Sequence, residues 1–264
     1  MMVIVILLFG LIIGSFLNVC IYRLPQSLPI TAPPSRCIRC RQKIKSCHLI
    51  PVISWLILRG CCRYCKTAIS IRYPAVELLT GLLFVFCFVK LGLSPNLFAA
   101  LILTSFFIVI ALIDFDHQLI LDSVLIWLAG AGIVVHLLMN QLSFSLNYTG
   151  NTGNFTTGAA GGIDMLLGIL AGAGLLLAIA AASRGGVGCG DIKFAAALGV
   201  WLGWQYNLLT LFIAFLLGGL TGGLLLALNR KKRKDYIPFG PFIAIGAWIS
   251  FLYGPALIEC YVRW

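Results

Sequence analysis

Long apolar segments separated by short polar ones dominate this chain. Eight apolar runs can be distinguished, and several reach the ~20 residues that a helix needs to cross a bilayer. They lie at 1–22, 76–93, 97–113, 123–140, 163–182, 194–206, 207–229 and 237–258. The run 194–206 is the shortest, so seven spans are the alternative to eight. The pattern predicts an all-α polytopic membrane protein with about eight transmembrane helices.

Composition leads to the same class of protein. A mean hydropathy of +1.03, with 61% hydrophobic and 10% charged residues, excludes an ordinary soluble domain. The first apolar run has no basic residue before it and no evident small-residue cleavage site after it. A secretory signal peptide would have both features. We therefore expect 1–22 to be a retained first transmembrane helix.

The net charge of +11 is unevenly distributed. Residues 23–75 hold ten Lys or Arg and no acidic residue, and five consecutive basic residues occupy 230–234. The positive-inside rule places 23–75 and 230–236 in the cytoplasm, and the N-terminus and the uncharged 141–162 loop outside. Topology and anionic lipid headgroups explain the basic loop. We therefore expect membrane lipid, and no nucleic acid, as a partner.

Four cysteines in the basic loop have the spacing of a metal site. Two CxxC pairs are separated by 21 residues, namely Cys37 with Cys40 and Cys62 with Cys65. Each pair can supply two thiolates to one tetrahedral zinc ion, and four thiolates leave no position for a catalytic water. Disulfides are the alternative, but a cytoplasmic location disfavours them. The sequence predicts a structural zinc site and assigns no role to Cys47 or Cys61.

Acidic residues are scarce, and two of them end or begin apolar runs. Asp114 follows the third run, and Asp191 closes the glycine-rich stretch before the sixth. Carboxylates at such positions are functional candidates. Glycines at 188 and 190 permit close approach of the backbone. If the two carboxyls meet, one can hold a proton while the other activates water, which is the chemistry of aspartic proteolysis.

Other roles for these acids remain open. Asp122 precedes an apolar run and is suited to cap a helix. Asp191 can equally cap its own helix. Asp116 fits a residue at headgroup level or a substrate contact. A transporter that relays protons through buried aspartates is a second possible function, and an assembly factor that docks partners through the basic loop is a third.

Several motifs resemble those of the type IV prepilin peptidases. The resemblance lies in GSFLNVCIYRLP at 14–25, IPVISWL at 50–56, ISIRYPAVELLT at 69–80, ALID at 111–114 and GCGDIK at 188–193, together with the two CxxC pairs. These motifs occur in the family's order across most of the chain. We therefore identify the chain as similar to this family of GxGD intramembrane aspartic peptidases.

The resemblance implies a bifunctional enzyme of the bacterial inner membrane. The aspartic endopeptidase would remove the basic leader of type IV prepilins or type II secretion pseudopilins after a glycine, at the cytoplasmic face. The second activity would methylate the new N-terminal residue with S-adenosylmethionine. No glycine-rich fingerprint for that methyl donor is visible in the sequence, so this activity rests on the resemblance alone.

The resemblance also implies roles for individual residues. Asp114 and Asp191 would be the catalytic pair, and Glu77 would be a cofactor-binding residue of the methyltransferase. The division that follows is a first helix at 1–22, a methyltransferase-associated zinc loop at 23–75 and a peptidase domain at 76–264. The particular substrates, the methyl-donor site and the oligomeric state are not fixed by the sequence.

Overall fold

The computed structural model describes residues 1–31, 36–37, 39–43, 50–145, 159–183, 186–228 and 237–263, without the side chains of 140–145, 159–160 and 262. Three features singled out in the sequence lie outside the described residues. They are Cys47, the basic segment 230–236 and most of the 141–162 loop.

The described part of the chain is helical, which confirms the predicted fold class. The helices are α1 (Met2–Arg23), α2 (Ile53–Ile57), α3 (Arg72–Leu91), α4 (Pro95–His117), α5 (Asp122–Ser145), α6 (Ala159–Ala182), α7 (Cys189–Ala227) and α8 (Gly240–Val262), with a short 3-10 helix η1 (Leu24–Gln26) after α1. Two isolated β-bridges are the only extended pairings among these residues. All helices except α2 and η1 correspond to predicted apolar runs.

Seven of the described helices are long and apolar enough to cross a membrane. The count differs from eight because the runs 194–206 and 207–229 both fall within α7, which has 39 residues. The helix is interrupted at Gly203, where φ is +67° and ψ is −175°. A side chain at this position would be strained, so glycine permits the break.

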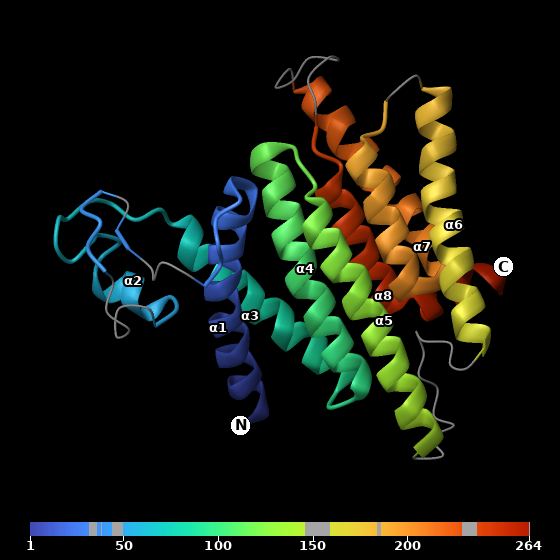
Figure 1. Ribbon diagram of the computed structural model, residues 1–264, viewed down its shortest axis with the longest axis horizontal. Helices are drawn as coiled ribbons and strands as arrows, with labels where there is room; N and C mark the ends of the chain where they lie inside the picture. Colours follow the sequence, from blue (N-terminus) through green and yellow to red (C-terminus); the bar gives the residue numbers. More distant parts are fainter. Residues whose placement is uncertain are drawn as a thin grey trace. The chain divides into compact units, whose positions relative to one another are not determined.

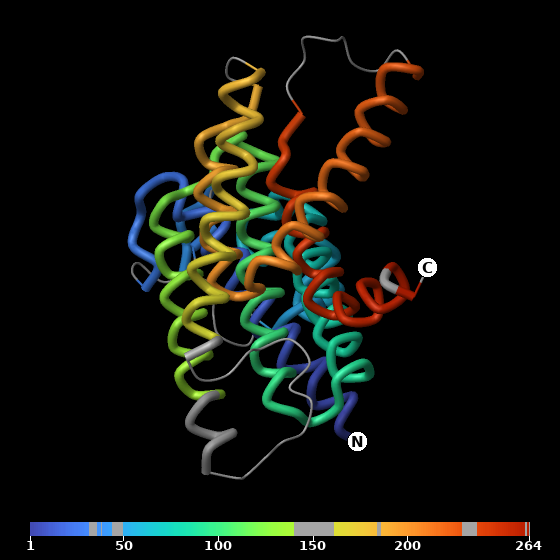
Figure 2. Tube along the Cα trace, turned by 90° about the vertical axis from the view of Figure 1, so that its right-hand side faces the viewer, coloured from blue at the N-terminus to red at the C-terminus, as the bar shows by residue number. Residues whose placement is uncertain are grey.

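The chain reverses direction at this break (Figure 2). The amide of Asn207 donates hydrogen bonds of 2.9 Å to the carbonyl oxygens of Ala195 and of Gly168 in α6. Residues 12 positions apart in a straight helix would be separated by about 18 Å. The contact between Asn207 and Ala195 therefore requires two antiparallel arms, so α7 contains both of the apolar runs that the sequence separates.

The chain forms two compact units, unit 1 (Met1–Leu97) and unit 2 (Phe98–Trp264). In unit 1, α1 packs along α3 (Figure 1). Gly10 and Gly14 make this contact close: a Cβ atom at Gly10 would lie 2.7 Å from the Cα of Gly81, and one at Gly14 would lie 2.7 Å from the Cα of Glu77. Small residues allow helices to pack this closely in membranes. Here they bring the backbone of α1 against the backbone of α3 at Glu77.

In unit 2, α7 packs against α5, α6 and α8. The fully buried indole of Trp201 donates a 2.8 Å hydrogen bond to the carbonyl oxygen of Leu128 in α5. The indole of Trp248 in α8 donates a 3.1 Å bond to the hydroxyl of Thr104 in α4. These bonds satisfy polar groups inside an apolar core and connect the helices that carry the acidic residues.

Candidate functional site

Asp114 lies in the last turns of α4 with its side chain buried, at 2% exposure. The backbone N–H of Gly240 donates a 2.9 Å hydrogen bond to its Oδ2 atom. Gly240 is the first residue of α8, so the carboxyl group lies at a helix N-terminus, where unpaired amides favour negative charge. A Cβ atom at Gly240 would lie 2.7 Å from the same oxygen. Only glycine therefore permits this contact.

Asp191 lies in the first turn of α7 and is 4% exposed. Its carboxyl group is close enough to that of Asp114 for the two charges to interact. The expected close approach of the glycine segment is found at Gly190, where a Cβ atom would lie 3.0 Å from the Cβ of Ile120. Gly188 has a φ of −68°, which any residue can adopt, so its backbone conformation does not require glycine. The structure thus brings together the two acids that the sequence singled out.

The other two acids of this region are exposed. Asp122 is the first residue of α5, and its carboxylate forms hydrogen bonds of 2.7 and 2.9 Å with Nζ of Lys193. Both side chains are at least half exposed. The ion pair connects the start of α5 to the first turn of α7, two residues after Asp191. Asp116 is also exposed, outside the buried pair.

The four predicted metal ligands of the basic loop form one cluster. The sulfur atoms of Cys37, Cys40, Cys62 and Cys65 all lie within 4.8 Å of one another. The sulfurs of Cys37 and Cys65 are 3.7 Å apart. A tetrahedral zinc ion with Zn–S bonds of about 2.3 Å requires S–S distances of about 3.8 Å. The cluster could therefore hold a metal ion, and its four thiol groups suit zinc.

The two CxxC pairs have the same backbone geometry. In the first, the N–H of Cys37 donates to the carbonyl of Gln42 at 3.0 Å, and the N–H of Arg41 donates to the carbonyl of Cys37 at 2.9 Å. In the second pair, the N–H of Cys62 donates to the carbonyl of Thr67 at 2.8 Å, and the N–H of Lys66 donates to the carbonyl of Cys62 at 3.0 Å. The sequence separations of five and four residues are the same as in the first pair. The residue after each pair has positive φ. Two equivalent turns therefore present the sulfurs.

Hydrogen bonding favours the thiolate form at two of the four cysteines. Bonds from the side chain and backbone of Thr67 lower the pKa of Cys65 to about 6. Bonds from the backbone of Cys40 and Arg39 lower the pKa of Cys37. At Cys40, a backbone bond from Gln42 lowers the pKa, but burial and the side chains of the other three cysteines raise it to about 11. Because the thiolate is the form that binds zinc, Cys37 and Cys65 are the two positions best prepared for a metal. Cys61 stands outside the cluster and forms a β-bridge with Ala68.

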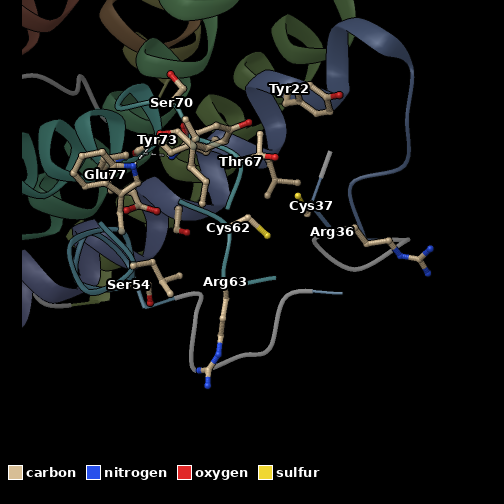
Figure 3. A pocket seen from close by; sticks show the side chains of 18 of the residues that line it. Tyr22, Arg36, Cys37, Ser54, Cys62, Arg63, Thr67, Ser70, Tyr73 and Glu77 are labelled. Carbon is tan, nitrogen blue, oxygen red and sulfur yellow. Dashed lines mark hydrogen bonds between the residues drawn. The ribbon is translucent and has the colours of Figure 1, made fainter. Parts of the chain in front are cut away.

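Glu77, the remaining predicted site residue, lines a cavity of about 600 Å³ in unit 1. Its side chain is 8% exposed, and its Oε2 atom accepts a 2.7 Å hydrogen bond from the backbone N–H of Val52. Ser15 is a second hydrogen-bond partner. Cys37 and Cys62 form part of the wall of the same cavity (Figure 3). Two cysteines of the metal cluster and Glu77 therefore line the same cavity.

The fold and these sites define a multi-pass membrane protein with a buried aspartate pair and a four-cysteine cluster. The model of the bacterial peptidase A24 N-terminal domain matches residues 8–91, and that of the type IV leader peptidase family matches 101–223. The chain belongs to the type IV leader peptidase family. This confirms the resemblance found in the sequence motifs.

Proteins named prepilin leader peptidase/N-methyltransferase are similar to the chain over nearly its whole length. That of Aeromonas salmonicida (strain A449) is 36% identical over 281 residues, covering 97% of this chain and 92% of its own. That of Bacillus subtilis (strain 168) is 35% identical, with coverages of 98% and 97%. That of Pseudomonas aeruginosa is 32% identical, with coverages of 97% and 92%. No solved structure matches the chain significantly.

Two contacts of the site were missed by sequence reasoning. Gly240 was not considered, although a glycine followed by Pro241 after a basic segment is a recognisable helix start. The contact between Val52 and Glu77 spans 25 residues and has no sequence signal. Both residues act through backbone N–H groups, which side-chain patterns do not reveal.

Proposed function

We propose that this chain is a bifunctional prepilin leader peptidase and N-methyltransferase of the bacterial inner membrane. Its substrates are type IV prepilins or type II secretion pseudopilins. It cleaves their basic leader after a glycine at the cytoplasmic face, and then methylates the new N-terminal residue. Membership of the leader peptidase family and the names of the relatives support both activities.

Asp114 and Asp191 are the catalytic pair of the peptidase. One carboxyl, kept protonated by its neighbour's charge, donates a hydrogen bond to the carbonyl oxygen of the scissile peptide. The other carboxylate removes a proton from a water molecule, which attacks the carbonyl carbon. The first carboxyl then passes its proton to the leaving amine. The observation that carries this assignment is the burial of both side chains within electrostatic range of one another.

The location of the pair suits a membrane-anchored substrate. Asp114 lies near the C-terminal end of α4, and Asp191 lies at the N-terminal end of α7. We place both ends, with 23–75 and 230–236, on the cytoplasmic side, and the N-terminus and 141–162 outside. A substrate with an apolar helix in the bilayer and a basic leader in the cytoplasm would then present its scissile bond at this boundary.

The experiment that tests the peptidase is cleavage of a leader-bearing prepilin by purified enzyme, followed by intact mass. Asp114→Asn and Asp191→Asn should each abolish leader removal, since an amide cannot exchange the proton. Asp122→Asn is the matched control, because an exposed ion pair contributes at most ~1 kcal/mol. The pair is wrongly assigned if either of the first two variants retains wild-type turnover.

The methyltransferase half includes Glu77 and the cysteine cluster. Cys37, Cys40, Cys62 and Cys65 hold a structural zinc ion, and Glu77 contacts the cofactor. S-adenosylmethionine, when bound, supplies an electrophilic methyl group on a sulfonium. The shared location of the cluster and Glu77 in one cavity wall supports this assignment. The basic loop and the cavity then form one functional region within unit 1.

A further inference from the structure

Thr67 is a half-buried residue outside the set of four cysteines, and it contacts both cysteines of the second pair. Its carbonyl oxygen accepts a 2.8 Å hydrogen bond from the N–H of Cys62. Its hydroxyl oxygen lies 3.3 Å from the sulfur of Cys65, and its backbone N–H bonds to the same sulfur. One residue therefore fixes the backbone of the turn at one cysteine and reaches the sulfur of the other.

The same hydroxyl also connects the second pair of cysteines to the first. Arg39 lies between Cys37 and Cys40 in the sequence. Its Nη1 atom donates a 3.4 Å hydrogen bond to the hydroxyl oxygen of Thr67, 28 residues further along the chain. Figure 3 shows Thr67 in the same part of the cavity wall as Cys37 and Cys62. Arg39 and Thr67 thus join the two cysteine turns through side chains that are not themselves ligands.

The direction of these hydrogen bonds follows from the chemistry of the three groups. A guanidinium group has donors and no acceptor, so the oxygen of Thr67 accepts from Arg39. The proton of the Thr67 hydroxyl is then available to the sulfur of Cys65. A thiolate that binds a metal carries no proton and can only accept. The bonds therefore run from Arg39 to Thr67 and from Thr67 to Cys65, and a positive charge lies at their start.

Such a chain of donors suits a four-thiolate metal site. Four thiolates around one divalent ion leave an excess of negative charge on the sulfurs. Hydrogen bonds to an ionised group are stronger than those to a neutral one. Partners of metal ligands that do not touch the metal hold the ligands in orientation and typically change metal affinity by about 10- to 100-fold. The Thr67 hydroxyl is in the position of such a partner for Cys65.

The first cysteine turn offers an internal comparison. Gln42 follows Cys40 by two residues, as Thr67 follows Cys65. The backbone of Gln42 makes the equivalent bonds, accepting from the N–H of Cys37 and bonding to Cys40. Its side chain, however, is an exposed amide. The two turns therefore share their backbone bonds and differ in the half-buried hydroxyl, so the hydroxyl is not needed to form the turn.

We propose that Thr67 is a positioning residue of the metal site, whose hydroxyl orients the sulfur of Cys65 toward the ion and links it to the charge of Arg39. The inference rests on the proposed zinc site and adds two residues outside its ligands. The alternative is that the hydroxyl serves only the cavity, which Thr67 also lines. In that case a methyl group in its place would leave metal binding unchanged.

Zinc affinity of the full-length protein in detergent, measured by competition with a chromophoric chelator, tests the proposal. Thr67→Val keeps the branched shape and removes the hydroxyl, and it should weaken zinc binding by about tenfold or more. Thr67→Ser keeps the hydroxyl and should bind zinc as wild type does. Gln42→Ala is the matched control in the first turn and should also equal wild type, because the bonds of Gln42 to that turn come from its backbone.

Arg39→Met tests the link between the two turns. Because Arg39 acts through Thr67, this change should weaken zinc binding in the wild-type background and have no further effect in Thr67→Val. The same loss in both backgrounds would overturn the link.

The cobalt(II) form shows whether the site of Thr67→Val still assembles, because thiolate-to-metal charge-transfer absorption requires the cysteines to meet at one ion. We expect this absorption at saturating cobalt. If it is lost, Arg39→Met alone decides, and zinc affinity equal to wild type in that variant would refute the proposal.

The failure of the inference differs from the failure of the zinc site. A wild type that binds no zinc contradicts the metal site as a whole. A wild type that binds zinc no more tightly than Thr67→Val contradicts only the role of Thr67. An equal loss in Thr67→Ser and Thr67→Val would also overturn that role, because the hydroxyl would then not be what the site requires.

Discussion

The contact between Gly240 and Asp114 allows the proposed catalytic carboxyl of Asp114 to be displaced without replacing the aspartate. In Gly240→Ala the new methyl group would lie 2.7 Å from Oδ2 and 3.1 Å from Cγ of Asp114. Both distances are shorter than an ordinary van der Waals contact. Because α8 is anchored in the core, the Asp114 side chain has to move and its bond from the Gly240 N–H is weakened or lost.

The size of the effect follows from that bond. A hydrogen bond to a charged group contributes about 1.5–3 kcal/mol, and about 1.36 kcal/mol corresponds to a tenfold change in rate. We therefore expect Gly240→Ala to lower kcat/KM for leader removal by about 10- to 100-fold. The melting temperature should change little, because the displaced group lies at a helix end.

Initial rates of leader removal from a purified prepilin provide the assay. Gly219→Ala is the matched control, since a Cβ atom at Gly219 would have no atom within 4 Å. The reasoning is refuted if Gly240→Ala cleaves within twofold of wild type while Asp114→Asn is inactive. That result would mean that the position of the carboxyl does not depend on Gly240.

Two further predictions concern the packing of unit 2 and the cysteine cluster. In Gly199→Ala the methyl group would collide with the backbone of Gly168 in α6, which cannot rotate away; we expect a loss of ~1–3 kcal/mol, seen as a lower melting temperature in detergent. Gly174→Ala, in open space, should melt like wild type, and equal melting of both variants would contradict the close crossing. In zinc-free protein, hydrogen bonds to its thiolate hold the pKa of Cys65 at about 6, so its alkylation by iodoacetamide should be half-maximal near pH 6. A half-maximum near the ordinary thiol value of about 8.5 would show that these bonds are absent.

The sequence predicted the elements whose signal is local. The apolar runs predicted the helices, because a segment inside lipid must form its backbone hydrogen bonds within itself. The CxxC spacing predicted the cysteine cluster, because two residues between ligands suffice to bring both to one ion. Asp114 and Asp191 were found because an acid beside an apolar run is rare. These signals need no knowledge of the tertiary structure.

The break in α7 was placed at the wrong residue for a physical reason. The boundary between two spans was predicted after Tyr206, whereas the chain reverses at Gly203. No proline or charge marks this position, and the polar residues Gln205 and Asn207 lie just after it inside an otherwise apolar run. The turn is stabilised by tertiary contacts, notably those of Asn207 with α6 and with the first arm. The cavity around Glu77 could not be predicted from the sequence for the same reason, because segments far apart in the sequence form it.

The reversal at Gly203 leaves Asp191 at the end of an unusually short helical arm. The arm Cys189–Leu202 has about 14 residues and is therefore about 21 Å long, against a hydrocarbon thickness of ~30 Å. The turn lies against Asp164 in the first turns of α6, whose carboxylate fills the space that a side chain at Gly203 would need. A thicker or thinner bilayer acts on such an arm by hydrophobic mismatch. We therefore expect the lipid chain length of the host membrane to influence the depth at which Asp191 lies.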